Sequence, residues 1–256
     1  MGFITWKLDQ TPGLLDRVLE RKPRAVFLSF GDPVPYGARI RDAGSTLFAQ
    51  VQTLADAERA VEAGAQVIVA QGTEAGGHGA RRATMTLVPE VADHLSNRAP
   101  ETLLLAAGGI ADGRALAAAL ILGADGVLCG TRFWASREAL VPEAQMRVAL
   151  AAHGDATVRG KVIDVARGLM DWPGRFDLRT MRNRFVDDWT GRVEALADDD
   201  AARANWLAAA EAGDPDMAPP IVGEAIGVIR DAPGAAEILA QMSAEAEGLL
   251  QGGWRR

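Results

Sequence analysis

The sequence has only one cysteine, Cys129, among its 256 residues. A single thiol excludes an intrachain disulfide and any metal cluster built from cysteines. Histidine is also scarce, because besides His78 there are only His94 and His153, and these two stand alone in segments with helical periodicity. We therefore expect no metal site.

Clusters of basic residues and long apolar runs are missing as well. The formal net charge is −7 and no run of lysine or arginine occurs, so the chain has little to offer the phosphates of a nucleic acid. The longest apolar runs are far shorter than the ~20 residues that cross a bilayer, and the amino terminus has no signal-peptide pattern. We expect a cytoplasmic protein with neither a nucleic-acid nor a membrane partner.

A regular alternation of apolar runs with amphipathic segments occupies the first half of the chain. Strands are predicted over residues 2–6, 25–30, 46–51, 66–70, 102–107 and 126–129. Helical periodicity fills the gaps: Thr11, which precedes Pro12, is predicted to cap one helix, and Thr53 is predicted to cap another that ends at Gly64. This series predicts an α/β fold with a parallel sheet, either doubly wound or a (β/α)8 barrel. No GxGxxG motif follows an early strand, which weakens the dinucleotide-binding alternative.

The strand signal disappears from about residue 137. Several helices broken by turns are predicted there, the last over residues 235–250, with a frayed tail over 252–256. The sequence thus predicts a strand–helix domain over residues 1–136, which carries the candidate site, and a helical subdomain over residues 137–256.

The candidate site centres on the stretch QGTEAGGHG, residues 71–79, which begins at the carboxyl end of a predicted buried strand. Four of its nine residues are glycine, so the backbone can approach a ligand closely and adopt positive φ. His78 adds an imidazole, a group suited to acid–base work near neutral pH. This combination indicates an active-site loop; a histidine that only pins the loop by hydrogen bonds is the alternative.

Two further glycine turns follow the last two predicted strands. They are Ala107-Gly108-Gly109 and Cys129-Gly130-Thr131. In a barrel, the loops after the last two strands commonly bind a phosphate through backbone amides. We expect the amides of these turns, with the hydroxyl of Thr131, to bind a dianion. The alternative is that strand-to-helix turns need glycine in any case.

Three strings, QGTEAGGHGA, LLLAAGGIADGRALAAALILGADGV and CGTRF, resemble the nitronate monooxygenases, formerly called 2-nitropropane dioxygenases. The resemblance extends from GFITW at the start through LSFGDP to IGVIRDAPGAAEIL near the end. It implies an FMN-containing (β/α)8 TIM barrel with a C-terminal helical subdomain on the substrate side. The implied activity is that of a flavoprotein monooxygenase, which oxidises alkyl nitronates with dioxygen to carbonyl compounds and nitrite. The implied partners are a small nitronate or nitroalkane and dioxygen.

The resemblance also implies roles for individual residues. His78 matches the histidine that acts as the active-site base or anchors the substrate. Ten residues match positions that contact FMN: Gln50 and Gln71 at strand ends, Gly76 and Gly77 in the loop backbone, and Ala107, Gly108, Gly109, Cys129, Gly130 and Thr131 in the phosphate turns. Gln50 departs from the lysine found there in some members. Four later residues either wall the substrate pocket or pack in the core: Trp172, Phe176, Arg182 and Phe185.

The number of strands leaves alternatives open. The family barrel has eight strands and this chain supplies six, so the resemblance implies that two amino-terminal strands are absent and the barrel is incomplete. If the sequence is complete, we expect weak FMN binding and self-association into a homo-oligomer through open sheet edges. Two alternatives to nitronate oxidation stay open. One is an FMN- and NAD(P)H-dependent oxidoreductase similar to enoyl-acyl-carrier-protein reductases. The other is a catalytically impaired fragment that needs its missing amino terminus or a partner chain.

Overall fold

The computed structural model describes residues 1–253, so the last three residues of the tail predicted over 252–256 lie outside the described residues. The chain forms two compact units. The first comprises Met1–Gly72, Arg81–Ala107 and Ala118–Leu128, and the second comprises Thr73–Ala80, Gly108–Ala117 and the chain from Cys129 onward. That residues 1–136 carry the site and residues 137–256 form a separate helical subdomain stays a prediction.

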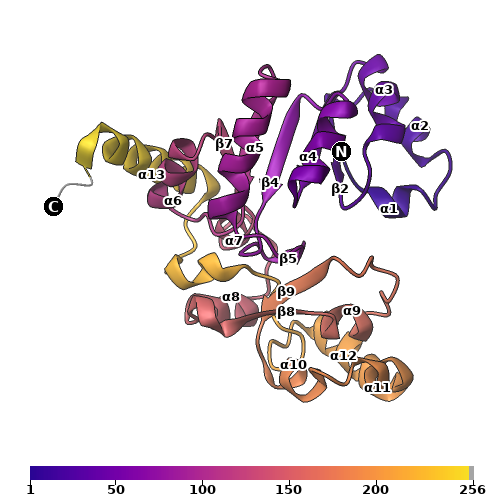
Figure 1. Ribbon diagram of the computed structural model, residues 1–256. Helices are drawn as coiled ribbons and strands as arrows, with labels where there is room; N and C mark the ends of the chain where they lie inside the picture. The colour runs from indigo at the N-terminus through magenta and orange to yellow at the C-terminus, as the bar shows by residue number, and fades with distance from the viewer. Residues whose placement is uncertain (254–256) are drawn as a thin grey trace. The chain divides into compact units, whose positions relative to one another are not determined.

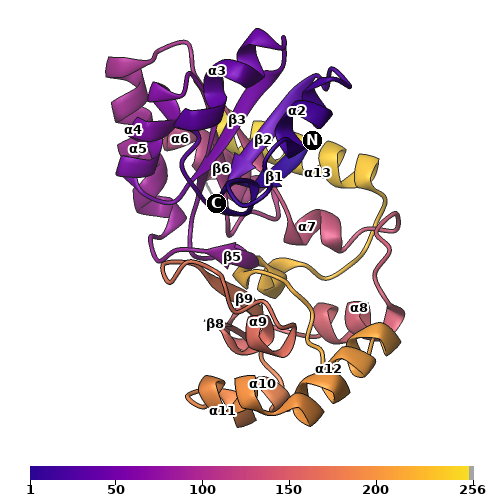
Figure 2. The ribbon, with the colours of Figure 1, turned by 90° about the vertical axis from the view of Figure 1, so that its right-hand side faces the viewer.

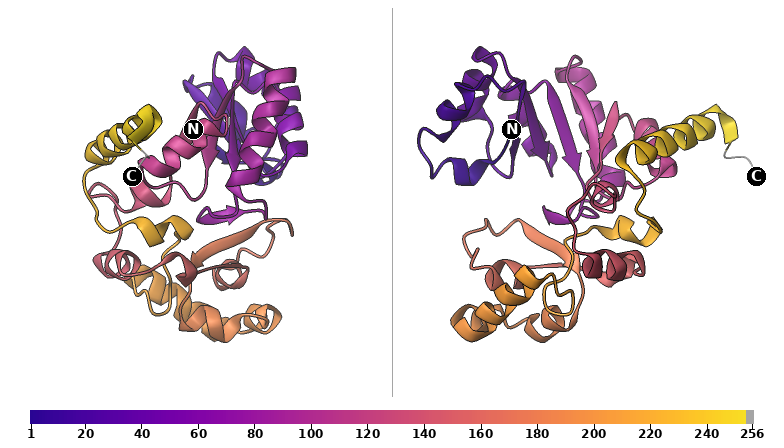
Figure 3. Two further views of the ribbon diagram at one scale, coloured as in Figure 1. Left: turned by 60° about the vertical axis from the view of Figure 1, so that its left-hand side comes forward. Right: turned by 180° about the vertical axis from the view of Figure 1, so that it is seen from behind.

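The first unit contains a six-stranded sheet in the order β1-β2-β3-β4-β6-β7 (Figure 1). Every neighbouring pair is parallel, and the strands lie side by side in Figure 3. Their bounds are β1 Gly2–Ile4, β2 Ala25–Ser29, β3 Thr46–Val51, β4 Val67–Gln71, β6 Leu103–Ala107 and β7 Gly126–Leu128. The six predicted strands and the α/β fold with a parallel sheet are therefore confirmed.

The helices of this unit follow the strands in alternation. They are α1 Thr5–Leu8, α2 Leu14–Leu19, α3 Val34–Asp42, α4 Leu54–Glu62 and α5 Thr84–Arg98, while α6 Gly113–Ile121 has residues in both units. Helices α3 and α4 contact β3, and α5 contacts β4 and β6. The predicted cap of α4 is confirmed, because Thr53 Oγ1 accepts a hydrogen bond from Asp56 N at 3.1 Å.

The beginning of the chain differs in detail from the prediction. The strand expected over residues 2–6 ends at Ile4, because the fully buried Thr5 starts α1. Thr11 does not cap the next helix: its hydroxyl donates to Lys7 O at 3.2 Å, and α2 begins after Gly13, whose φ is +77°. A threonine before a proline favours an N-cap locally, and here the contact with the preceding helix prevails.

The second unit contains a three-stranded antiparallel sheet in the order β5-β9-β8, with β5 Gly77–Gly79, β8 Thr157–Gly160 and β9 Asp177–Met181. The prediction that no strand follows residue 137 is therefore wrong. Strands β8 and β9 carry Thr157, Arg159, Arg179 and Thr180, so they lack the apolar run that marks a buried strand.

Helices make up most of the rest of the second unit. They are α7 Thr131–Trp134, α8 Glu143–Leu150, η1 Gly154–Ala156, α9 Val162–Ala166, α10 Arg184–Trp189, α11 Val193–Asp198, α12 Asp200–Ala212, η2 Glu224–Val228, α13 Ala235–Gly248 and η3 Leu249–Gly253. Figure 2 shows α9 beside β8 and β9, and α10, α11 and α12 each contact α9. Their core includes Ile163, Leu178, Phe185, Leu196 and Trp206. Within residues 1–253, no helix has the length and apolarity that crossing a bilayer requires.

Candidate active site

The carboxyl ends of β3, β4, β6 and β7 meet along one edge of the parallel sheet. In the strand register Val51 lies beside Ala70, Gln71 beside Ala107, and Ala107 beside Leu128. The segments that follow these strands therefore all begin at this edge, where open α/β sheets and barrels place their ligands.

Three glutamines form a hydrogen-bonded cluster at this edge. Gln50 Nε2 and Gln52 Nε2 both donate to Gln71 Oε1, at 2.7 and 3.1 Å. Ser29 Oγ donates to Gln50 Oε1 at 3.4 Å. Gln50 and Gln71, which the sequence predicts as flavin contacts, are thus brought together, and the buried Gln52 joins them. Gln52 is not among the residues predicted from the sequence; the signal it offers is a polar residue directly after the end of an apolar strand.

The first glycine turn needs glycine for its backbone. Gly108 and Gly109 have φ of +99° and +77°, which side-chain-bearing residues rarely adopt. Within the first unit, the carbonyl oxygen of Ala107 accepts hydrogen bonds from Gly72 N at 2.8 Å and from Thr84 Oγ1 at 3.3 Å.

The second glycine turn has no such backbone requirement. Gly130 has an ordinary φ of −91°, and a Cβ added there would meet no atom within 4 Å. Thr131 Oγ1 accepts a hydrogen bond from Gly223 N at 2.9 Å, and the hydroxyl keeps its hydrogen for donation. Burial raises the pKa of the Cys129 thiol to about 11, so this side chain stays uncharged at neutral pH.

His78 lies in β5 with its imidazole held by two side chains of the second unit. Its Nε2 is 3.0 and 2.9 Å from the carboxylate oxygens of Asp164 in α9. Its ring stacks on the Trp172 ring with centroids 3.4 Å apart and 13° between the planes. The side chains of His78 and Asp164 are only 10% and 3% exposed, so the pair is largely shielded from water.

Asp164 lies 86 residues from His78 in the chain and is not among the residues predicted from the sequence. The available signal is that Asp164 is the only polar residue of α9, whose sequence is VIDVA. The sequence does not decide whether Trp172 walls a pocket or packs in the core. In the structure its ring stacks on that of His78, and the Phe176 ring lies edge-on to Trp172 at a centroid distance of 6.4 Å.

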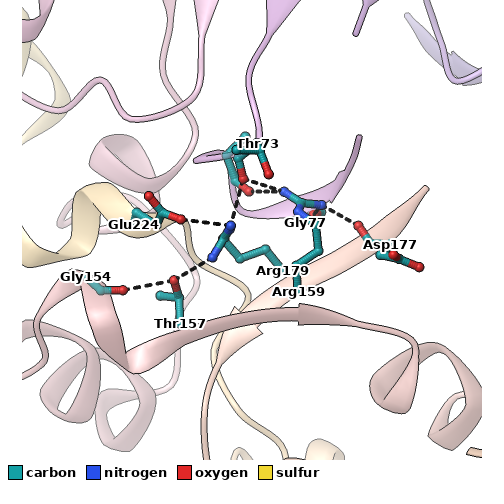
Figure 4. A network of polar contacts seen from close by, with 9 residues as sticks. Thr73, Gly77, Gly154, Thr157, Arg159, Asp177, Arg179 and Glu224 are labelled. Atoms are coloured by element: carbon teal, nitrogen blue, oxygen red, sulfur yellow. Dashed lines mark hydrogen bonds and ion pairs between the residues drawn. The ribbon is translucent and has the colours of Figure 1, made fainter. Parts of the chain in front are cut away.

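Two arginines hold the backbone that leads to His78 (Figure 4). Arg159 in β8 and Arg179 in β9 are cross-strand partners, and both donate to the carbonyl oxygen of Thr73, at 2.9 and 3.0 Å. Burial, with the nearby charge of Arg179, lowers the pKa of Arg159 to about 10. Neither arginine is predicted from the sequence, because their partnership arises only from the pairing of β8 with β9.

Each of the two units carries groups of a kind that suits a flavin nucleotide. The turns supply backbone amides and the Thr131 hydroxyl, which are donors suited to a phosphate. The space that a Cβ at Gly130 would occupy is open, with no atom within 4 Å. The glutamine amides both donate and accept hydrogen bonds, as the polar edge of an isoalloxazine ring requires. Among the described residues, no group of three or more His, Cys, Asp or Glu side chains is arranged to hold a metal ion.

Comparisons with known proteins agree with this chemistry. The family described as nitronate monooxygenase matches residues 8–245. A nitronate monooxygenase of Neurospora crassa is 35% identical in an alignment 271 positions long, which covers 96% of this chain and 71% of that protein. The structure resembles FabK of Thermotoga maritima, with a TM-score of 0.79, 26% identity and coverage of 98% and 76% of the two chains. It also resembles a nitroalkane oxidase of Streptomyces ansochromogenes, with a TM-score of 0.75, 26% identity and coverage of 93% and 68%.

The chain belongs to the nitronate monooxygenase family. It is accordingly a flavin-dependent oxidoreductase, and the FMN cofactor that the sequence motifs imply is confirmed by this membership. The family relationship and the fold are thus shown, whereas the roles of individual residues are proposals.

Proposed function

We propose that this chain, loaded with FMN, oxidises alkyl nitronates with dioxygen to carbonyl compounds and nitrite, and that His78 is the side chain that contacts the substrate. The observation that carries the proposal is the imidazole held between Asp164 and Trp172 at the end of a glycine-rich segment. Membership of the family supports the reaction, and the shielded histidine supplies a group suited to an anionic substrate.

The cofactor contacts expected from sequence remain part of this proposal. The amides of Gln50 and Gln71 and the backbone of Gly76 and Gly77 would contact the flavin. Its phosphate would be held by the two turns, Ala107-Gly108-Gly109 and Cys129-Gly130-Thr131. Bound FMN would supply the electron transfer between nitronate and dioxygen, while the protein supplies position and electrostatics. We also propose that the six-stranded sheet belongs to a flavin-type (β/α)8 barrel.

Asp164 determines what His78 can do. A carboxylate beside Nε2 accepts the hydrogen bond of that nitrogen, so Asp164 sets the tautomer and the orientation of the ring. The imidazole takes the α-proton of a neutral nitroalkane. Once protonated, the imidazolium is stabilised by Asp164 and holds the anionic nitronate by a charge-assisted hydrogen bond. Stacking on Trp172 fixes the plane of the ring during both steps.

The test is His78→Ala in the FMN-loaded chain. A positioned acid–base group contributes about 100- to 10,000-fold, so we expect kcat/KM for a primary nitroalkane to fall by at least about 100-fold while bound FMN is unchanged. His153→Ala is the matched control, because its side chain is 72% exposed. Turnover of His78→Ala equal to that of the wild type would remove this histidine from the reaction.

The enoyl-acyl-carrier-protein reductase alternative receives less support. The matching family and the Neurospora crassa relative are both nitronate monooxygenases. Rapid reduction of bound FMN by NADH, without reduction by a nitronate, would favour the alternative. The homo-oligomer stays a prediction, which light scattering on the FMN-loaded chain can check.

A further inference from the structure

Arg159 and Arg179 have no part in the proposed cofactor or substrate contacts, yet they are tied to the His78 segment by hydrogen bonds (Figure 4). Arg159 Nη2 donates to the carbonyl oxygens of Thr73 and Ala75, at 2.9 and 2.8 Å. Its Nη1 donates to those of Gly77, at 3.2 Å, and of Asp177. One guanidinium thus gathers three carbonyl groups at alternate positions of the segment.

Arg179 reinforces the same segment from the neighbouring strand. Its Nε donates to Thr73 O, its Nη1 donates to Thr157 Oγ1 at 3.0 Å, and its Nη2 lies 2.9 Å from Glu224 Oε1. We name residues 73–77 together with these two side chains the arginine clamp.

We propose that Arg159 and Arg179 are positioning residues for His78, which act by holding the backbone of residues 73–77. The proposal rests on the proposed function in one respect, the contact between His78 and substrate. The clamp ends at Gly77, the residue directly before His78, so a displacement of this backbone displaces the imidazole from Asp164 and Trp172.

The stability of the small sheet does not by itself explain this pair. Like charges directly opposite on neighbouring strands destabilise a sheet, and Arg179 is only 8% exposed. The pKa of Arg159 is lowered to about 10 by burial and by this neighbour. An apolar cross-strand pair would avoid both costs. What arginine adds is a planar fork of five donors, which can bond several carbonyl oxygens at once, whereas a lysine has a single nitrogen to offer.

The other side of residues 73–77 is held by residues 222–224. Glu224 N donates to Glu74 O at 2.9 Å, and a Cβ on Gly76 would lie 2.5 Å from Gly223 N. Gly223 N in turn donates to Thr131 Oγ1. Because Glu224 also pairs with Arg179, a continuous polar network connects the Thr131 turn with the segment that leads to His78.

The experiment compares Arg159→Met and Arg159→Lys with the wild type as FMN-loaded full chains. A displacement of about 1 Å can cost about 100-fold in rate, so we expect Arg159→Met to keep its FMN and lose about 100-fold in kcat/KM for a nitronate. Arg159→Lys keeps the positive charge but not the planar fork of donors, so its kcat/KM should lie between those of the wild type and Arg159→Met. Arg184→Met is the matched control, because that side chain is 91% exposed.

A second readout does not depend on activity. The Trp172 ring, 3.4 Å from the imidazole, shifts the ring-proton NMR signals of His78 upfield by its ring current. We expect this upfield shift to collapse in Arg159→Met and to shrink in Arg159→Lys, while the signals of His94 and His153 stay in place. If Met at position 159 prevents folding, Arg159→Lys and Arg179→Lys carry the test.

The outcomes separate the two proposals. His78 signals that are identical in the wild type and in the folded variants would overturn the arginine clamp as a positioning device. A wild type that oxidises no nitronate would overturn the proposed function, and the NMR comparison would still decide the role of the arginines. Loss of the upfield shift together with the fall in kcat/KM supports both.

Discussion

Asp164→Asn tests whether His78 needs a negatively charged partner or only a side chain of this size beside it. Asparagine keeps the size of the side chain and one oxygen that can accept from Nε2, so the change removes the negative charge and replaces the second oxygen with an amide nitrogen. The carboxylate is 3% exposed and lies 2.9 to 3.0 Å from Nε2. We therefore expect His78 to stay in place while the imidazolium loses its counter-charge.

The size of the effect follows from the strength of the contact. A hydrogen bond to a charged group contributes about 1.5–3 kcal/mol. Each 1.36 kcal/mol is a factor of ten in rate, so kcat/KM should fall by about 10- to 150-fold. Because little water reaches the pair, solvent screening does not reduce this figure much.

The assay is the rate of flavin reduction by a nitronate, measured anaerobically by stopped flow. A matched control is present in the same unit, since His153 and Asp155 form a second His–Asp contact at 3.6 Å with side chains 72% and 99% exposed. Asp155→Asn should change the rate by less than about twofold, because exposed ion pairs contribute little. If the rate of Asp164→Asn also lies within about twofold of the wild-type rate, the role assigned to Asp164 is refuted.

Three further outcomes are expected. Trp172→Leu removes the ring stacked on His78, and since an aromatic pair contributes about 0.5–1.5 kcal/mol, kcat/KM should fall by about 2- to 10-fold in the same assay. Gly130→Ala adds a methyl group with no atom within 4 Å at an ordinary φ, so the thermal unfolding temperature should be unchanged while the Kd for FMN, measured by fluorescence titration, rises. The pKa of Cys129 is raised to about 11 by burial, so the thiol is protonated below that pH; its alkylation by iodoacetamide should be slow at neutral pH and accelerate as the pH rises toward 11.

Most of the first unit could be predicted from sequence because its signals are local. Buried parallel strands are apolar on both faces, so runs such as VIVAQ and LLLAA identify β4 and β6 directly. Glycines at strand ends and the Thr53 cap are equally local. The register then explains why separate turns belong together, since Ala107 lies beside both Gln71 and Leu128.

The features that could not be predicted from the sequence depend on contacts between segments far apart in the chain. The His78–Asp164 contact joins residues 86 positions apart, and nothing in the sequence VIDVA indicates which side chain its carboxylate meets. Strands β8 and β9 were missed because Arg159 and Arg179 occupy positions where an apolar pattern would mark a strand. These arginines bond backbone carbonyls, which look the same for every residue type, so no sequence pattern records the partnership.

The most direct test is to mix the FMN-loaded chain with a primary alkyl nitronate without oxygen and follow the visible flavin band. We expect the band to bleach rapidly with the nitronate, to return when dioxygen is admitted with release of nitrite, and to bleach slowly with NADH. A flavin that NADH reduces rapidly and the nitronate leaves oxidised would contradict the proposed reaction.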